Sequence, residues 1–435
     1  ERRAKSIVLS KEIKSLLGIK EDAVSGEQLV TAILKMNVDL LWFGGIGTYI
    51  KNESETHFQV GDPANDSVRI NNTHVNARVI GEGANLGVTM SARIAMSQKN
   101  IKLNTDFIDN SAGVNMSDYE VNIKILLKRL LMQNIIKNEE ERNTILEKAT
   151  DEVTALVLEN NKSQHQLISM DEIRSRKNLS VFHKLIQHLI SEKILNPAEE
   201  ILPDHAQIED LASNQKPIPR PTLSTLQSYT KMHIQKELTF STLAEHQELQ
   251  DYYIEYLPKI ILKKFSKDIN EHYLKKEIIT TAISNTVINQ AGITFIYQTQ
   301  QITGKSTEEI ILAYIIADKS ISGSVLRNTI KKSTTSMQSK YEALIELDER
   351  IQELVIDILQ LPNTETSFEL VPIIKNILDS LDKKVKPSAS LTNKWVNSGF
   401  SNKEAKQIAF TYLFSTLSDI LYFQQQTKQI GRAHV

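Results

Sequence analysis

Two turns in the first third of the sequence carry the residues best suited to hold a ligand. The first, residues 81–87 (GEGANLG), follows an apolar-alternating segment and precedes an amphipathic one, which is typical of a strand end in a parallel sheet. Its G-x-G-x-x-x-G spacing is related to the dinucleotide-binding fingerprint. Asp106 and Asp109 follow at about the distance at which an acidic residue accepts a ribose hydroxyl bond. A strand–helix turn without a ligand has the same spacing, so both interpretations stay open.

The second turn, residues 109–114 (DNSAGV), follows the next predicted strand. Its small residues allow backbone and short amides to reach into a cleft, although asparagine is also common in ordinary turns. Ser117 and Glu120 behind it have the spacing of a capping box. Ser117 is therefore predicted either to cap the following helix or to hold an anion, such as a substrate carboxylate, at free backbone N–H groups.

Alternating strands and helices are predicted to position these turns, in a parallel, right-handed α/β arrangement. The predicted strands are residues 39–43, 75–80 and 101–108, with helices at 11–17, after Ser25, and at 90–98. From Ser117 onward the pattern is helical, with Gly292 ending one helix and prolines marking a stiff linker near 216–222. The predicted fold class is α/β followed by all-α.

Composition excludes several classes of function. The 435 residues carry a formal net charge of -2 and no block of basic residues, which argues against nucleic acid or a membrane surface as a partner. The absence of cysteine excludes disulfides and thiolate metal sites. The ten histidines are scattered without metal-ligand spacing, so no metal site is predicted. No apolar run reaches membrane-spanning length, and a cytoplasmic protein is expected.

Several segments, taken in order, resemble the glutamate dehydrogenase family. Residues 82–85 match its EGAN signature, and residues 110–117 resemble its Asn-Ala-Gly-Gly-Val-x-x-Ser turn. Residues 39–49 (DLLWFGGIGTY) are most similar to the large, NAD-specific bacterial branch. The resemblance continues into the helical part, where residues 274–295 are similar to that branch's C-terminal region, and it weakens beyond about residue 330.

The resemblance implies NAD as cofactor and L-glutamate and 2-oxoglutarate as substrate and product. It places the EGAN turn on the nicotinamide side of the sheet, which replaces the ribose role that spacing gave to Asp109. The implied site residues are these: Gly44 and Gly45 line the cleft floor, Glu82 and Gly83 belong to the cofactor turn, Asn85 lies near the nicotinamide ribose, Asn110 lies near the carboxamide, and Ser117 binds the glutamate side-chain carboxylate.

The resemblance also implies that the catalytic lysine and the pyrophosphate loop precede Glu1, so no catalytic residue is assigned here and the isolated chain is expected to be inactive. We interpret residues 1–145 as the second half of a Rossmann-like domain and 146–429 as a helical region. Residues 430–435 are interpreted as a non-native tail. The full-length protein is expected to form a homo-oligomer. Two alternatives stay open: a dehydrogenase of another amino acid, and a non-catalytic helical regulatory or assembly module.

Overall fold

A computed structural model describes residues 2–361, 366–417 and 420–421. The chain forms two compact units, and neither is one continuous stretch of sequence. Unit 1 comprises Glu1–Lys124, Thr150–Ile168 and Ile190–Ser228, and unit 2 comprises Ile125–Ala149, Ser169–Leu189 and Tyr229–Val435. The predicted boundary between residues 145 and 146 lies inside the long helix α7 (Glu139–Lys177).

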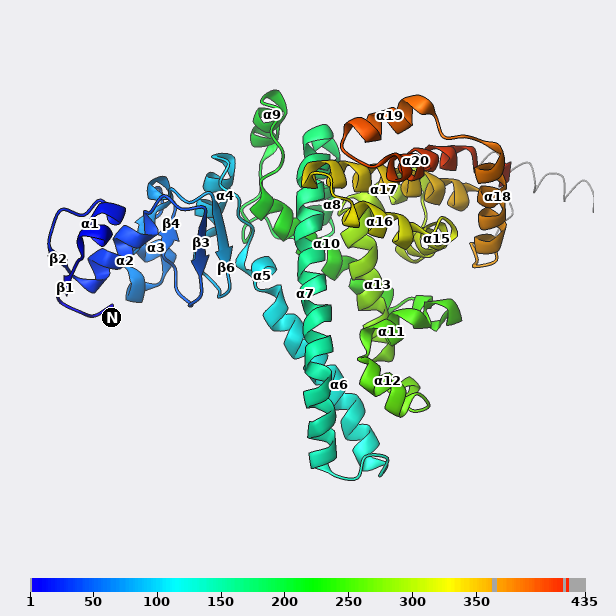
Figure 1. Cartoon of the computed structure of the whole chain (residues 1–435), viewed down its shortest axis with the longest axis horizontal. Helices are drawn as coiled ribbons and strands as arrows, with labels where there is room; N and C mark the ends of the chain where they lie inside the picture. The colour runs from blue at the N-terminus through cyan, green and yellow to red at the C-terminus, as the bar shows by residue number, and fades with distance from the viewer. Residues whose placement is uncertain (1, 362–365, 418–419, 422–435) are drawn as a thin grey trace, which may run out of the picture. The chain divides into compact units, whose positions relative to one another are not determined.

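Unit 1 contains the strands and the glycine-rich turns (Figure 1). Its strands are β1 (Ile7–Val8), β2 (Ala23–Val24), β3 (Leu40–Phe43), β4 (Ile50–Lys51), β5 (Ile70–Asn71) and β6 (Val79–Glu82). Its own helices are α1 (Lys11–Leu17), α2 (Gly26–Leu34), α3 (His57–Val60), α4 (Met90–Gln98), α5 (Asp106–Asp109) and α9 (His205–Ser213). Four further helices contribute residues to both units: α6 (Ser111–Met132), α7, α8 (Leu179–Ser191) and α10 (Arg220–Thr239).

Short parallel sheets position the two turns. Strand β3 pairs in parallel with β6, in a register that runs from Leu40 opposite Val79 to Phe43 opposite Glu82. Strands β4 and β5 form a second parallel pair, while β1 and β2 pair antiparallel. The structure therefore confirms the prediction of a part with parallel strands followed by a large helical region.

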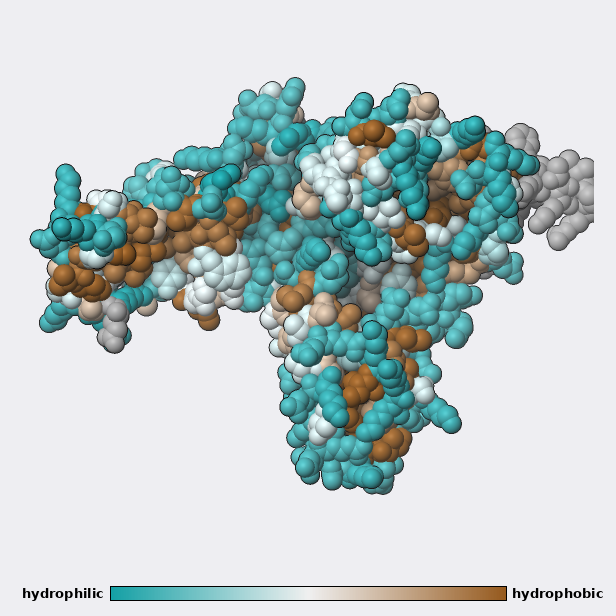
Figure 2. Space-filling view, in the orientation of Figure 1, coloured by the Kyte–Doolittle hydropathy of each residue, from teal (hydrophilic) through white to brown (hydrophobic). Residues whose placement is uncertain are grey.

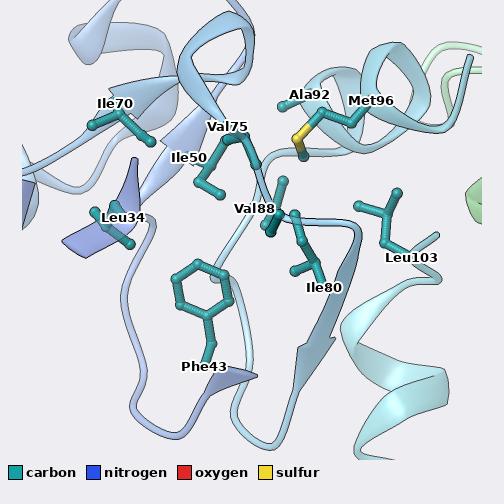
Figure 3. Close-up of a cluster of buried hydrophobic side chains, with 11 residues drawn as sticks. Leu34, Phe43, Ile50, Ile70, Val75, Ile80, Val88, Ala92, Met96 and Leu103 are labelled. Atoms are coloured by element: carbon teal, nitrogen blue, oxygen red, sulfur yellow. The ribbon is translucent and has the colours of Figure 1, made fainter. Parts of the chain in front are cut away.

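One buried apolar cluster holds these strands and helices together (Figure 3). Phe43 and Ile80 contribute to it from the paired strands, and Ala92 and Met96 contribute from the face of α4. Its other members are Leu34, Ile50, Ile70, Val75, Ala77, Val88 and Leu103. Burial of this kind stabilises by about 1.5–3 kcal/mol for each large side chain, so the cluster fixes α4 against the sheet and the turn between them.

The predicted strand at residues 101–108 is wrong. Only Lys102 makes a strand-like bridge, to Val79, and α5 occupies residues 106–109. Asp106 and Asp109 lie in the first turn of this helix, where negatively charged side chains interact favourably with the helix dipole. The strand predicted at residues 75–80 is displaced, since β6 begins at Val79.

Unit 2 is built from helices. In addition to the shared ones these are α11 (Gln250–Tyr256), α12 (Lys259–Phe265), α13 (Lys275–Ala291), α14 (Phe295–Thr303), α15 (Thr307–Ser320), α16 (Gly323–Lys332), α17 (Met337–Gln360), α18 (Leu370–Lys384), α19 (Ala389–Asn397) and α20 (Asn402–Phe410). Gly292 ends α13 as predicted, with φ 96° and its N–H bonded to Ile288 O. None of the described helices combines the length and apolarity that a bilayer crossing requires. The predicted tail, residues 430–435, lies outside the described residues.

Candidate cofactor-binding site

Gly81 and Glu82 of the predicted turn are the last residues of β6, and the turn that leaves the strand at Gly83 is held by two carboxylates. Leu86 N–H donates to Asp106 Oδ2 at 2.8 Å, and Gly87 N–H donates to Glu82 Oε1 at 2.8 Å. Leu86 has φ 68°, a left-handed conformation that non-glycine residues adopt uncommonly. The two carboxylates therefore fix a backbone shape that the sequence of the turn does not favour by itself.

Beneath the turn, Arg93 of α4 forms a buried ion pair with Glu82. Arg93 Nη1 also donates to the Asn104 carbonyl at 3.1 Å, and Nη2 lies 3.6 Å from Asp106 Oδ1. Burial raises the pKa of Glu82 to about 7; Arg93 opposes this shift, and the nearby Asp106 and Asp109 carboxylates add to it. Glu82 was predicted to be a cofactor-binding residue, and its carboxylate lies inside the protein, bonded to Gly87 and Arg93.

Asn85 and Asn110, which lie in separate turns of the sequence, meet at the end of β6. Asn110 Nδ2 donates to Asn85 Oδ1 at 2.9 Å. Asn85 is exposed and Asn110 is half-buried, so part of each carboxamide faces solvent. Gly113 leaves room for this pair, because a Cβ at Gly113 would lie 3.0 Å from Asn110 Oδ1. The pair offers amide donors and acceptors to a polar ligand.

Gly44 and Gly45 lie at the same end of the paired strands. They follow β3 directly, both are exposed, and no heavy atom outside their immediate neighbours lies within 4 Å of the place where a Cβ would be. Gly83 N–H donates to Phe43 O at 2.8 Å, which ties the loop after β6 to the end of β3. The structure therefore brings Gly44, Gly45, Gly83 and the two asparagines to one edge of the sheet.

A second set of polar residues, from α7, lies behind the turn between α5 and α6. His165 Nε2 lies 3.0 Å from Asp109 Oδ1, and its Nδ1 lies 2.8 Å from the Asn161 carbonyl. Because both partners are acceptors, both ring nitrogens carry a proton when both bonds form. Burial lowers the pKa of His165, but the bonds to Asp109 and Asn161 outweigh it and the net shift is upward.

Asp109 and Asp106, the acidic residues selected by spacing, accept hydrogen bonds from other groups of the protein. Asp109 Oδ2 accepts from Glu82 N–H at 3.1 Å, and Oδ1 accepts from Asn104 Nδ2 at 3.1 Å. Sequence reasoning missed Arg93, Asn161 and His165. Asn161 and His165 lie at least fifty positions from the residues around Asn110 that they contact, and Arg93 lies eleven positions from Glu82 on a different element. Among the described residues no group of three or more His, Asp or Glu side chains is arranged to hold a metal ion.

The predicted capping box at Ser117 is wrong. Helix α6 begins at Ser111, so Ser117 lies in its second turn and its backbone N–H is not at a helix terminus. The Ser117 hydroxyl donates to Gly113 O at 3.4 Å, and the residue is exposed. A substrate role for Ser117 would therefore come from its exposed hydroxyl on the side of α6 and not from free N–H groups.

Hydrophobic residues gather on the visible face of unit 1 (Figure 2). The exposed apolar residues of β3 and β6 are Leu40, Trp42 and Val79, and Trp42 is 57% exposed. The Trp42 indole lies against the backbone of β6, since Cβ atoms at Gly81 and Gly83 would approach it to 2.7 and 2.6 Å. Glycine is therefore needed at both positions for this packing.

We expect Gly83→Ala to destabilise unit 1 by about 1–3 kcal/mol, because the added methyl group overpacks the contact with Trp42. Denaturant unfolding in a Trp395→Phe background, where Trp42 is the remaining tryptophan, measures the change. Gly45→Ala is the matched control, since a Cβ there meets open space. Equal unfolding midpoints for the two variants would contradict the expected overpacking.

Two family models match the chain. Residues 1–171 match the model for the bacterial NAD-glutamate dehydrogenase catalytic domain. Residues 215–431 match the model for the glutamate dehydrogenase C-terminal region. Together the matches include every predicted site residue as well as Arg93, Asn161 and His165.

Three curated proteins with the name NAD-specific glutamate dehydrogenase are similar in sequence. The protein from Halomonas elongata is 35% identical over 347 residues, which is 80% of this chain and 22% of that protein. The protein from Pseudomonas aeruginosa is 39% identical over 72% of this chain and 19% of its own length. The protein from Mycobacterium tuberculosis is 37% identical over 73% of this chain and 20% of its own length. The chain thus spans about a fifth of the length of these relatives.

Proposed function

The chain belongs to the bacterial NAD-glutamate dehydrogenase family, and from this premise we propose that it forms the nicotinamide side of the cofactor cleft in a longer enzyme. That enzyme oxidises L-glutamate to 2-oxoglutarate and ammonium and transfers the hydride to NAD. The observation that carries the proposal is the Asn85–Asn110 pair, with its two amides joined at the end of β6. Ligands of open parallel sheets bind at the carboxyl ends of the strands.

We also propose that unit 1 is the second half of a Rossmann-like sheet. The parallel β3–β6 pair, the further bridge to Lys102 and the glycine-rich turn after β6 support this. Parallel sheets are normally covered on both faces, whereas Leu40, Trp42 and Val79 are exposed here. We infer that another part of the longer polypeptide covers this face.

The residues of this chain would act by positioning. NAD supplies the hydride acceptor, and the protein's part is to hold the reacting groups in register in a cleft with little water. Asn85 would hydrogen-bond the nicotinamide ribose, and Asn110 would hydrogen-bond the carboxamide. Gly44 and Gly45 would allow close approach at the cleft floor, because no side chain occupies the space above them.

Nicotinamide mononucleotide is expected to bind this chain at its asparagine pair. The test is a titration of the chain labelled with ¹⁵N-asparagine, with AMP as the matched ligand that lacks the nicotinamide. The mononucleotide should shift the side-chain amide resonances of Asn85 and Asn110, and AMP should leave them in place. Asn110→Ala should weaken binding about fivefold, as expected for one lost hydrogen bond. Equal responses to both ligands, or none, would argue against the site.

Ser117 is proposed to bind the side-chain carboxylate of glutamate through its exposed hydroxyl. In the full-length enzyme we expect Ser117→Ala to raise the KM for glutamate about tenfold, the effect of losing a hydrogen bond to a charged group, while the KM for NAD stays near its original value. Ser117→Thr, which keeps the hydroxyl, is the control. A loss of thermal stability with both KM values unchanged would limit Ser117 to its bond with Gly113.

Of the two alternatives, the helical regulatory or assembly module is not favoured, because the catalytic-domain model matches residues 1–171. A dehydrogenase of another amino acid differs at the side-chain pocket, which the Ser117 experiment addresses. Homo-oligomer formation by the full-length protein and a cytoplasmic location stay predictions.

A further inference from the structure

Asn161 and His165 lie one helical turn apart on α7 and face the turn that carries Asn110. Side chains four residues apart share one face of a helix. The Asn161 side-chain amide donates to two backbone carbonyls at the end of α5, with Nδ2 3.0 Å from Ile108 O and 3.3 Å from Asp109 O. Nδ2 also lies 2.9 Å from Ser111 Oγ. One side chain therefore contacts the residues before and after Asn110.

His165 extends this contact to the turn that carries Asn85. Its Nε2 binds Asp109 Oδ1 at 3.0 Å, and Asp109 Oδ2 accepts from Glu82 N–H at 3.1 Å. The orientation of His165 is itself fixed, because Nδ1 lies 2.8 Å from the Asn161 carbonyl. Asp109 is largely buried, with 9% of its side chain exposed, so this carboxylate joins α7 to the start of the other turn.

We propose that Asn161 and His165 are positioning residues that hold the Asn110 and Asn85 carboxamides in register for a nicotinamide ligand. The identity of that ligand rests on the proposed function, whereas the positioning role concerns contacts within unit 1 alone. Asn161 fixes the backbone around Asn110, and His165 fixes the Asp109 carboxylate between the two turns. Without these two side chains, the backbone next to Asn110 and the Asp109 carboxylate lose the hydrogen bonds that hold them to α7.

The experiment compares side-chain amide spectra of the ¹⁵N-asparagine-labelled chain and its variants without ligand. His165→Ala and Asn161→Ala should both move the Asn110 and Asn85 amide resonances. His165→Gln, which keeps an N–H donor near the place of Nε2, should restore much of the original spectrum. His205→Ala is the matched control in the same unit, because the His205 side chain is 75% exposed. If His165→Ala fails to fold, the positioning role is tested by comparing His165→Gln with Asn161→Ala. The Asn85 and Asn110 resonances should move in Asn161→Ala and stay close to their original positions in His165→Gln.

Nicotinamide mononucleotide affinity gives the second readout. Both alanine variants should lower it about fivefold, the size of one lost hydrogen bond, and His165→Gln should recover most of the loss. Asparagine resonances that stay in place in both alanine variants while the unfolding midpoint falls would overturn the positioning role. Absence of mononucleotide binding by the unsubstituted chain would instead count against the proposed function, and the ligand-free spectra would still decide this inference.

Discussion

Replacing Arg327 with methionine is expected to destabilise unit 2 by about 3–5 kcal/mol, the usual cost of removing one partner from a buried ion pair. Arg327 of α16 is 5% exposed. Its Nη2 donates to Asp348 Oδ1 at 2.9 Å and to the Tyr314 hydroxyl at 2.9 Å, and its Nη1 pairs with Asp318. Methionine fills similar space and leaves two carboxylates without this cation.

The expected loss is large because Arg327 belongs to a network that joins several helices. Asp348 of α17 also binds Arg174 of α7, with Oδ2 3.1 Å from Nη2, and Arg174 Nη1 lies 2.8 Å from Asp171 Oδ1. Asp171 Oδ2 accepts from Ile293 N–H at 3.2 Å, just after α13. Burial raises the pKa of Asp348 against the opposing effect of the two arginines, so removing one arginine favours protonation and weakens the remaining bonds.

Trp395 is the reporter for this prediction. It lies in unit 2 and is 1% exposed, and a Trp42→Phe background makes it the remaining tryptophan. Urea unfolding followed by its fluorescence gives the stability of the unit that contains the network. Arg327→Lys should lose part of the stability, because lysine keeps the charge and loses the planar fork.

Lys305→Met is the matched control for the Arg327 experiment. Lys305 pairs with Glu309 one turn away on the surface, at 2.8 Å and with both side chains at least 40% exposed. Pairs of this kind contribute less than about 0.5 kcal/mol. If Arg327→Met and Lys305→Met shift the unfolding midpoint equally, the buried network does not stabilise unit 2 in the way expected.

Local sequence chemistry was sufficient to predict several elements. The predicted helix at residues 11–17 ends at Gly18, which is left-handed in the structure, and the helix predicted after Ser25 begins with a capping box between Ser25 and Gln28. A turn follows the parallel strand β6 and precedes α4, as the glycine spacing and flanking periodicity indicate, although Gly81 and Glu82 of the predicted turn belong to the strand. Each of these predictions depends on residues within a few positions of one another.

The errors arose where distant residues decide the local structure. Residues 109–114 were predicted to form a turn because they are small and polar, but α6 begins at Ser111. Asn161 donates to the Ser111 hydroxyl and to the carbonyls of Ile108 and Asp109, and no short-range pattern reveals a partner fifty residues away. The same limit applies to Glu82, whose burial depends on Arg93 and on α5 and was not visible in the EGAN signature.

Replacing Glu82 with glutamine is expected to remove much of the pH dependence of unit 1 stability in weak acid. In the folded chain the pKa of Glu82 is raised from 4.5 to about 7. Between these values the folded state holds a proton that the unfolded state has released, so stability falls as the pH rises. The slope is about 1.4 kcal/mol per pH unit, and the whole window amounts to roughly 3 kcal/mol. Glutamine stays uncharged and has no such slope.

Between about pH 4.5 and 6.5, the contribution of Glu82 to the pH dependence of stability can be measured apart from that of His165. The pKa of His165 is also raised, and a raised histidine pKa makes stability fall only as the pH rises above the ordinary value of 6.5. Carboxylates of lowered pKa in unit 1, such as Asp62, act mainly below this window. The difference between Glu82→Gln and the unsubstituted chain therefore reports Glu82.

Denaturant unfolding at several pH values, in the Trp395→Phe background with Trp42 as reporter, measures how the free energy of unfolding changes with pH. The slope is compared between Glu82→Gln and the chain with Glu82. Glu120→Gln is the control, because the Glu120 side chain is 54% exposed in the same unit, and it should leave the slope unchanged. Parallel slopes for Glu82→Gln and the unsubstituted chain would mean that Glu82 stays ionised with Arg93 throughout. The glutamine carbonyl can still accept from Gly87 N–H, whereas an amide NH2 in the place of Oε2 cannot accept from Arg93. The turn that carries Asn85 should therefore keep its bond to this side chain, while the bond to Arg93 and the pH dependence are lost.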